Sequence, residues 1–394
     1  MHPDSVRHAL ATHVAAANDL TGRWCDRLGS SGDFVLSGCG VWPLLAILAE
    51  VANEPARAEL SAATGIAADT ARSAGLALLA ELADAESASA ALGVWVREDL
   101  TVREEWSRTL PEGTVEPLTG QAALDAWADR HTGGLIDRFP LDVEPETVLM
   151  LATALVAKTA WDTPFNDSVL EPDSGPWAGH RGPGLARYSG ALSDADVLAA
   201  DAPVTRVVVR GTADLDVHLL LGPDSPTTSP AEVIAAGLGA LDGSIAARAA
   251  LDTASAPDPV AAPGVTVREA RATADALRIE LPPFEIRSEH DLMSHPDLFG
   301  LSTASDPTSG HFPGMSDEPL HVDRAAQHAR ARFTRGGFEA AAVTAVSMVR
   351  SVAFIRPHAT TELAVTFDRP FGFLAVHRPT GLAVVAGWVA QPAV

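Results

Sequence analysis

The sequence has few cysteines and almost no lysine. Its 394 residues include only two cysteines, Cys25 and Cys39, too few for a disulfide framework. We expect two buried free thiols; a bridge between them and a catalytic pair are the alternatives. Lys158 is the only lysine among 28 basic residues, and we interpret this skew toward arginine as a bias of genomic composition.

Positive charge is scarce, because 51 acidic residues outnumber 28 basic ones and give a formal net charge of −23. Such an excess of negative charge argues against nucleic-acid phosphate as a partner. No basic cluster interrupts it, so an anionic membrane surface is equally disfavoured. We therefore expect neither a nucleic acid nor a membrane as a partner.

Long hydrophobic runs are also absent. The most apolar window, 148–160, carries Lys158, and it is too short for a transmembrane helix. Residues 1–20 carry charged side chains such as Asp4 and Arg7 and have no uninterrupted apolar core, so no cleavable signal peptide is visible. Either the protein acts in the cytoplasm or a leader has been removed.

Apolar residues make up 47% of the chain, enough for an extensive core and too many for general disorder. Strands dispersed among helices over the full length predict a single α+β domain, residues 1–394. Apolar periodicity favours helices at 5–28, 41–53 and 122–130. Strands are expected at 34–37, 91–96, 148–157, 206–209, 215–221, 276–286, 371–376 and 382–388. Two hairpins are expected, one joining 206–209 to 215–221 across Gly211-Thr212 and one joining 371–376 to 382–388 across the turn 377–381.

Glycine and proline mark the expected breaks in these elements. A Gly-Cys-Gly break at 38–40 separates the first strand from the second helix. Pro282 and Pro283 interrupt a strand and so place it near a sheet edge or a bend. Segments 163–184 and 254–264 are rich in turn residues and are expected to be surface loops.

A run of small residues follows two glycines toward the C-terminus. Gly336 and Gly337 open the segment; the alanines after them favour helix, while Val343, Thr344 and Val346 favour strand. A segment so balanced could be a loop in one state of the protein and a sheet strand in another. The run comprises Phe338, Glu339, Ala340, Ala341, Ala342, Val343, Thr344, Ala345, Val346, Ser347 and Met348.

The two faces of this run differ when it is read as a strand, because alternate residues point to opposite sides. One set carries no charge, and the only charge of the other, Glu339, could stay in solvent. One face can therefore be buried without an unpaired ion, which would cost several kcal/mol. The alternative is an ordinary exposed helix or a permanent strand. The uncharged set is Phe338, Ala340, Ala342, Thr344, Val346 and Met348.

Six sequence blocks in collinear order, spread over roughly residues 5–392, resemble the serpin family. Each block alone is a weak signal, whereas six in the right order are a strong one. We expect a divergent member of bacterial type. The blocks are Phe34 to Gly65, Leu124 to Ile136 with Trp127 and Thr132-Gly133-Gly134, Leu149 to Phe165 with Lys158 and Trp161, Leu281 to Leu301 with Pro282-Pro283-Phe284, Phe367-Asp368-Arg369-Pro370-Phe371, and Gly387 to Pro392.

The resemblance implies a metastable fold: a five-stranded central sheet and an exposed reactive loop at about 335–362. After cleavage this loop would become a sixth strand and would carry along a protease still attached as an acyl-enzyme. The expected partner is thus a serine protease, or a cysteine protease, and the chain itself needs neither catalysis nor a cofactor. The family also implies a monomer in an extracellular setting, against the cytoplasmic location that the N-terminus suggests.

The bond that a protease would cleave has two candidates. Counting from the loop hinge, as in inhibitory members of the family, gives Ser351-Val352. One residue earlier, Arg350-Ser351 would offer an arginine to a trypsin-like pocket. Both stay open, within a bait region of 348–354.

The resemblance also assigns residues that control opening of the sheet, and several differ from the family pattern. At the "breach" we assign Trp161, Lys158 and Thr153, where Thr153 replaces the usual asparagine. At the "shutter", Ser37 is followed by Gly-Cys-Gly, and the usual histidine is replaced by Gln327, which can donate and accept and so could rebuild the polar network. Further departures are Phe338, where the family has Thr or Ser, Arg335, where it has an acidic residue, and His328, one place off register.

Two other functions compete with a protease inhibitor. A protein of this fold whose loop does not insert could act as a decoy, a carrier or a binding module, and Phe338 and the altered shutter favour it. An enzyme is a third class, but neither a Gly-x-Ser-x-Gly elbow nor a His-Glu-x-x-His helix occurs in the sequence. His290 and His295 are five residues apart, which is wrong for two metal ligands on one helical face.

Overall fold

The computed structural model describes residues 3–132, 134, 138–139, 142–143, 147–225, 227–256, 262–338 and 358–393. These residues divide into two compact units. The first comprises Met1–Trp24, Leu36–Val156 and Arg287–Arg330, and the second comprises Cys25–Val35, Ala157–Ile286 and Ala331–Val394. Because the chain passes between the units several times, neither corresponds to one continuous half of the sequence.

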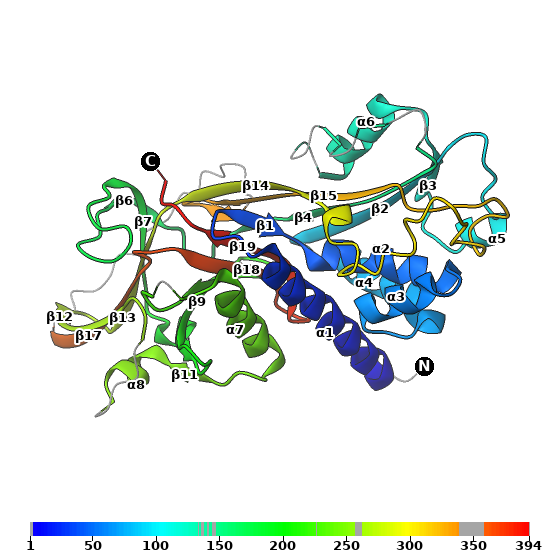
Figure 1. Cartoon of the computed structure of the whole chain (residues 1–394). Helices are drawn as coiled ribbons and strands as arrows, with labels where there is room; N and C mark the ends of the chain where they lie inside the picture. Colours follow the sequence, from blue (N-terminus) through cyan, green and yellow to red (C-terminus); the bar gives the residue numbers. More distant parts are fainter. Residues whose placement is uncertain are drawn as a thin grey trace. The chain divides into compact units, whose positions relative to one another are not determined.

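Helices and strands alternate irregularly along the chain, as expected for an α+β protein (Figure 1). The helices are α1 Pro3–Leu28, α2 Gly38–Val51, α3 Ala56–Thr64, α4 Ala68–Asp84, α5 Glu104–Ser107, α6 Gln121–Thr132, α7 Pro230–Asp242 and α8 Ala250–Ala254, with short 3-10 helices at Leu192–Asp194 and Leu292–Ser294. The strands are β1 Phe34–Leu36, β2 Ala88–Val96, β3 Val115–Pro117, β4 Leu149–Ala157, β5 Thr159–Ala160, β6 Asn166–Leu170, β7 Gly182–Ser189, β8 Ala195–Leu198, β9 Val204–Arg210, β10 Leu215–Leu221, β11 Ala247–Ala249, β12 Val265–Ala272, β13 Ala276–Leu281, β14 Phe284–Asp291, β15 Arg324–Phe333, β16 Gly337–Phe338, β17 His358–Thr366, β18 Phe371–His377 and β19 Leu382–Val389.

The strands form three sheets. One has the order β1-β19-β18-β10-β9-β8-β11, and another has the order β12-β17-β13-β7-β6. The third runs β3-β2-β4-β15-β16-β5, with β14 paired to β15. The expected hairpins are confirmed, because β9 pairs with β10 and β18 with β19, both antiparallel. Among the described residues, no helix has the length and apolarity needed to cross a membrane.

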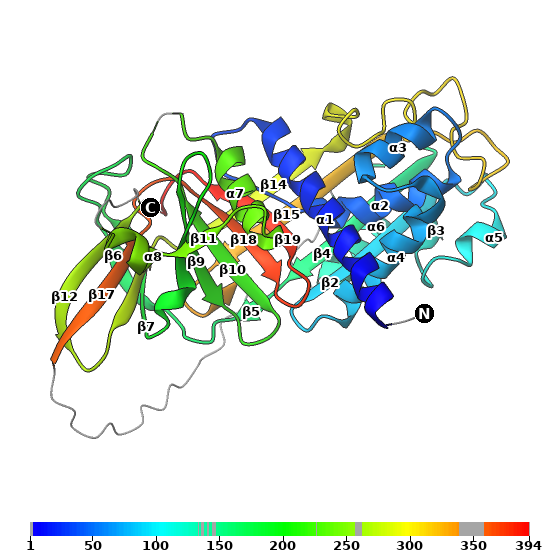
Figure 2. The ribbon, with the colours of Figure 1, turned by 90° about the horizontal axis from the view of Figure 1, so that it is seen from below.

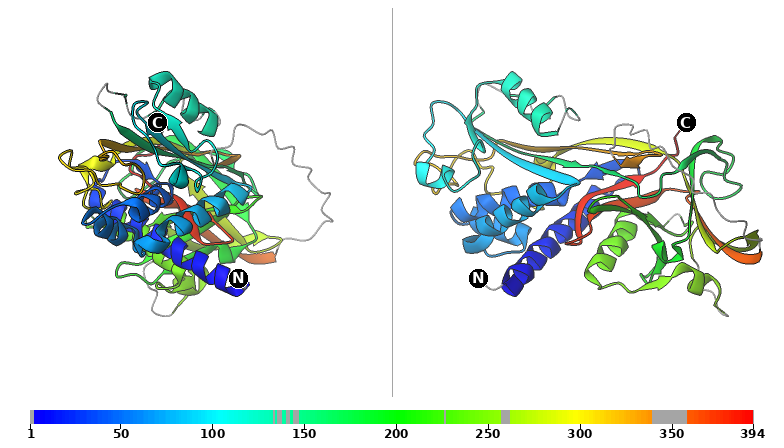
Figure 3. Two further views of the ribbon diagram at one scale, coloured as in Figure 1. Left: turned by 90° about the vertical axis from the view of Figure 1, so that its right-hand side faces the viewer. Right: turned by 180° about the vertical axis from the view of Figure 1, so that it is seen from behind.

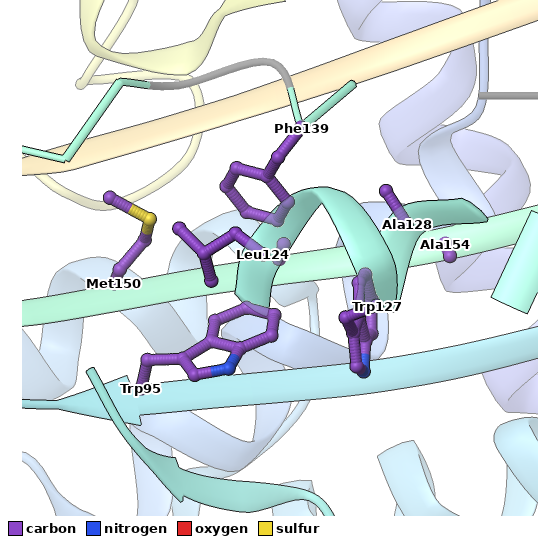
Figure 4. Close-up of a cluster of buried hydrophobic side chains, with 8 residues drawn as sticks. Trp95, Leu124, Trp127, Ala128, Phe139, Met150 and Ala154 are labelled. Carbon is purple, nitrogen blue, oxygen red and sulfur yellow. The ribbon is translucent and has the colours of Figure 1, made fainter. Parts of the chain in front are cut away.

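In the first unit, α6 covers one face of β2 and β4, and α2, α3 and α4 lie on the other face (Figures 1 and 3). Rings between α6 and the sheet meet edge to face: the centroid of Trp95 lies 5.0 Å from that of Trp127 and 5.4 Å from that of Phe139. Figure 4 shows this cluster, which comprises Trp95, Leu124, Trp127, Ala128, Phe139, Met150, Ala152 and Ala154.

Helix α2 begins at Gly38, so the expected break at 38–40 is wrong. The Ser37 hydroxyl accepts the Gly40 N–H at 3.0 Å and caps the helix three residues earlier than the periodicity suggested. Glycine at 38 is needed for packing, because an added Cβ would lie 2.2 Å from Oγ1 of Thr21. The propensity of glycine for turns is overridden here by close packing of two helices.

The two prolines at 282–283 mark a bend, and among the described residues the strand that follows them, β14, pairs with β15 alone and so lies at a sheet edge. They separate β13, an interior strand between β17 and β7, from β14, which belongs to another sheet. The expected surface loop at 163–184 is also wrong in part, because it contains β6 and the start of β7, which pair antiparallel. Within 254–264, residues 257–261 lie outside the described part of the chain.

Candidate functional site

The glycine hinge identified in the sequence is a tight turn that returns the chain to the sheet. Phe333 at the end of β15 pairs antiparallel with Phe338 of β16. On its other side β16 pairs antiparallel with β5, where Gly337 faces Ala160 and Phe338 faces Thr159. Phe338 therefore occupies a strand position between two other strands, with Gly336 and Gly337 supplying the turn.

The side chain of Phe338 is completely buried, with an exposed fraction of 0%. Its ring centroid lies 6.3 Å from that of Phe373 on β18. Burial of a phenylalanine side chain contributes about 2–3 kcal/mol. The sheet thus accommodates a phenylalanine at the position where the family has Thr or Ser.

Trp161 holds the hinge turn through its backbone and its indole. The indole N–H donates to the Thr334 carbonyl at 2.9 Å, and the Trp161 backbone N–H donates to the Gly336 carbonyl at 3.0 Å. The Phe165 N–H donates to the Arg335 carbonyl at 3.0 Å. Three successive carbonyls of the turn are therefore bound by the segment that follows β5. We call Trp161 and Phe165, with these three bonds, the hinge clamp.

Aromatic packing and one buried cation stabilise the hinge clamp. The ring centroid of Trp161 lies 4.7 Å from that of Phe333, and the centroid of Phe165 lies 5.5 Å from it. The guanidinium of Arg187 lies 4.8 Å from the centre of the Phe165 ring. Burial lowers the pKa of Arg187 to about 10, so it remains a cation at neutral pH. Its Nη1 donates to the Thr163 carbonyl at 3.3 Å.

The turn between β9 and β10 contacts the hinge clamp at Trp161. Trp161 forms an antiparallel bridge with Gly211, and an added Cβ on Gly211 would lie 2.2 Å from Oγ1 of Thr159. Arg378 donates to the Gly211 carbonyl at 3.0 Å and to both carboxylate oxygens of the buried Asp216. This bond to Asp216 holds the pKa of Arg378 above its usual range.

Replacing Trp161 by phenylalanine should loosen the hinge selectively. The change keeps an aromatic ring against Phe333 but removes the 2.9 Å bond to Thr334, which contributes about 1 kcal/mol, or roughly fivefold in an opening equilibrium. Hydrogen exchange of the amides of residues 334–338 should accelerate by about that factor. Trp177→Phe is the matched control, because it removes a similar indole bond to Ala390. Equal exchange at 334–338 in both variants would contradict this assignment.

In the first unit, Ser37 and Gln327 form the polar contact that the sequence predicted. Oε1 of Gln327 accepts the Ser37 N–H, its Nε2 donates to the Ser37 carbonyl, and both distances are 2.8 Å. Ser37 is 3% and Gln327 is 4% exposed. A glutamine amide, with its acceptor oxygen and its donor nitrogen, therefore satisfies both backbone groups of a buried serine.

The other predicted site residues are less informative. Thr153 on β4 is half-buried, and Lys158 is a half-buried residue between β4 and β5. Residues Glu339, Ala340, Ala341, Ala342, Val343 and Thr344 of the loop and the bond candidates Arg350, Ser351 and Val352 lie outside the described residues.

Cys25 and Cys39 are buried free thiols, as expected. Burial raises the pKa of each thiol to about 12, so neither is a thiolate nucleophile at neutral pH. In the described part of the chain, no group of three or more His, Cys, Asp or Glu residues is placed to hold a metal ion.

Sequence reasoning missed Arg187, Thr334 and Phe373, which complete the hinge clamp and the site of Phe338. Each comes from a segment remote in sequence from its partner, and an isolated arginine or phenylalanine carries no local signal. Only the pairing of strands brings them together.

A family model described as Serpin (serine protease inhibitor) matches residues 15–174 and 263–392. Plasminogen activator inhibitor 1 of Neovison vison is 29% identical over 113 residues, 28% of this chain and 26% of that protein. Glia-derived nexin of Rattus norvegicus is 29% identical over 118 residues, 29% of this chain and 28% of that protein. These alignments thus span little more than a quarter of either relative.

Solved structures resemble the whole chain. Human thyroxine-binding globulin in complex with thyroxine superposes with a TM-score of 0.72 at 17% identity, covering 98% of this chain and 100% of the other. Native protease nexin-1 with heparin gives 0.70 at 16% identity over 98% and 100%, and native tengpin, a thermophilic serpin, gives 0.69 at 16% over 99% and 95%. At these identities the likeness establishes the fold, with its three sheets.

Proposed function

Because the chain belongs to the serpin family, whose members are described as serine protease inhibitors, we propose that it inhibits a serine-type endopeptidase as a suicide substrate. The protease attacks a bond in the loop after Phe338 and forms an acyl-enzyme. The freed loop then adds to the sheet beside β15 and carries the enzyme with it before deacylation. Membership of this family also means that the chain is not an enzyme.

The observation that carries the proposal is the place of Phe338. It is paired with β15 on one side and with β5 on the other, antiparallel to both. A strand that grows from Phe338 would continue this ladder without changing its register. The first residue of the inserted strand is therefore already paired. Insertion needs no new nucleation, but its propagation must separate β4 from β15, which pair at Arg324 and Ala325.

The residues of β15 suit such a strand. Its odd-numbered residues are buried, and extending the register of Phe338 and Phe333 brings the uncharged face of the loop onto them. Glu339 would then lie opposite Arg332, which is exposed and carries the opposite charge. The buried pairs would be Ala340 with Ala331, Ala342 with Ala329, Thr344 with Gln327 and Val346 with Ala325.

Arg350-Ser351 and Ser351-Val352 are the bonds that we propose for attack. An arginine before the bond suits a trypsin-like target, and a cysteine protease would form an equivalent acyl-enzyme. We further assign Trp161, Lys158 and Thr153 to opening of the sheet next to the hinge, and Ser37 and Gln327 to closure at its centre. Action as a monomer, a single domain over 1–394 and bacterial origin stay predictions.

A panel of trypsin-, subtilisin- and elastase-like proteases tests the proposal. At least one should form a covalent complex that survives boiling in detergent, and mass spectrometry of the released fragment should locate the bond between 348 and 354. Cleavage of the loop by a non-target protease should raise the melting temperature markedly, because exposed backbone becomes sheet. Clean cleavage by every enzyme, with no complex and no rise in melting temperature, would rule out the trap.

The hinge clamp also favours a second candidate, a binding or decoy protein whose loop does not insert. Three hydrogen bonds and the buried Phe338 ring hold the turn and could stop propagation. In that case the cleaved and intact proteins would melt at the same temperature. The melting experiment therefore separates the two functions.

A further inference from the structure

Strand β17, which follows the reactive loop, is held on both sides. It lies between β12 and β13 in the sheet of order β12-β17-β13-β7-β6, and Figure 2 shows β12 and β17 side by side. β12 pairs antiparallel with residues 358–365, while β13 pairs parallel with residues 362–366. Within the described part of the chain, the first four residues of β17, 358–361, thus have β12 as their only ladder partner.

Strands β12 and β13 are consecutive in sequence, yet β17 lies between them. The connection 273–275 must therefore cross β17 at the end where the chain arrives from the loop. Asp275 in this connection accepts the N–H of Thr361 at 2.7 Å. We call residues 264–275, β12 with its flanking residues, the clasp.

The far end of the clasp is fixed as well. The carbonyl of Gly264 accepts the N–H of Thr366 at 3.0 Å. Gly264 has a φ of +67°, and an added Cβ would lie 2.6 Å from the Thr366 carbonyl oxygen, so glycine is required there. The clasp is therefore bound to β17 from its first residue to its last.

We propose that the clasp retains β17 in its sheet, so that the uncleaved loop is kept out of the central sheet and cleavage alone releases it. This rests on the proposed function. Without cleavage, a strand paired along all of β15 would use residues 338–347 and leave ten residues to return to His358. Ten residues reach about 36 Å at full extension, barely more than the length of β15 itself. Release of residues 358–361 would add about 13 Å of slack.

The direction of the backbone N–H groups provides a matched pair of variants. Because Gly264 and Thr366 form a hydrogen-bonded pair, the even-numbered residues of β12 direct their N–H toward β17 and the odd-numbered ones toward the free edge. Ala270→Pro removes an N–H directed at Thr360, next to the hydroxyl bond from Thr360 to the Ala270 carbonyl. Val267→Pro is the control, because it removes a backbone N–H that points away from β17, toward the free edge of the sheet.

The uncleaved proteins are incubated at 37 °C and sampled over days. Conversion is followed as resistance of the loop to subtilisin, a raised melting temperature and an unchanged intact mass. Ala270→Pro should convert at least about tenfold faster than wild type, and Val267→Pro at the wild-type rate. Equal rates for Ala270→Pro and wild type, when cleaved wild type does gain thermal stability, would overturn the clasp alone. Cleaved wild type that gains no stability would overturn the proposed function and the clasp with it.

A second route avoids dependence on the folding of a proline variant. Asp275→Ala removes only the exposed acceptor of the Thr361 N–H and should accelerate conversion severalfold. Conversely, a disulfide made by Glu269→Cys with Thr361→Cys, residues that lie opposite each other, should stop conversion until a reductant is added. Conversion at an unchanged rate with the disulfide intact would overturn the clasp.

Discussion

Phe338→Glu should turn the protein from an inhibitor into a substrate. The carboxylate would replace a ring with an exposed fraction of 0%, and burial of an unpaired charge costs several kcal/mol. The carboxylate would displace residue 338 from its buried position between β15 and β5 already in the uncleaved protein, so the inserted strand would have no paired first residue from which to propagate. Titration against a protease that wild type traps should show the covalent complex reduced at least about tenfold, with full cleavage of the loop.

Two controls separate the charge from the change of shape. Phe338→Leu keeps an apolar side chain in the same site and should still trap the protease. Ala341→Glu places the same carboxylate on the opposite face of the loop, where Glu339 already stands, and should also trap it. If Phe338→Glu trapped the protease as well as wild type does, the buried position of residue 338 between β15 and β5 would have no part in trapping.

The buried His218 on β10 should contribute to destabilisation of the protein by acid. Burial lowers the pKa of His218 to about 3, further lowered by Arg206 and opposed by Asp216. The folded protein therefore keeps this imidazole neutral, while the unfolded chain takes up a proton near pH 6.5. Its contribution to stability is complete above pH 6.5 and is lost as the pH falls toward 3, on the order of 4–5 kcal/mol in all.

His218→Leu should remove this contribution to the acid sensitivity. Among the described residues, Nδ1 of His218 has no hydrogen-bond partner. An apolar side chain at this position therefore breaks no hydrogen bond of that nitrogen. Denaturant unfolding between pH 7 and pH 4 should show a shallower loss of stability in the variant than in wild type. The same change at the exposed His358 should leave the slope unaltered. Identical slopes for His218→Leu and wild type would refute the role of His218.

Local patterns predicted most of the elements. Apolar alternation around a Gly-containing turn was sufficient for the hairpin of β18 and β19, because neighbouring strands specify their own pairing. The breaks were less predictable. At Gly38 the fit against Thr21 decides the start of α2, and at Pro282 and Pro283 the bend carries the chain from one sheet to another. Both depend on tertiary contacts that a sequence window does not contain.

The candidate site divides in the same way. The hinge glycines and Trp161 were identified in the sequence, because their order along the chain carries the signal. The hydrogen bond from the Trp161 indole to the Thr334 carbonyl could not be predicted. Every residue has a backbone carbonyl, and the sequence does not show which of them accepts from the indole. The course of β12 around β17 was equally hidden, because an edge strand of mixed charged and apolar residues resembles a surface loop.

The position of β17 between β12 and β13 constrains how the nascent chain can fold. β12 and β13 are synthesised well before β17, because 76 residues, 282–357, separate the end of β13 from the start of β17. Two strands that are consecutive in sequence and joined by only three residues would ordinarily pair with each other as a hairpin. Here they must stay apart, or separate again, until β17 has been synthesised and can pair between them. This sheet can therefore be completed only after β17 has been synthesised.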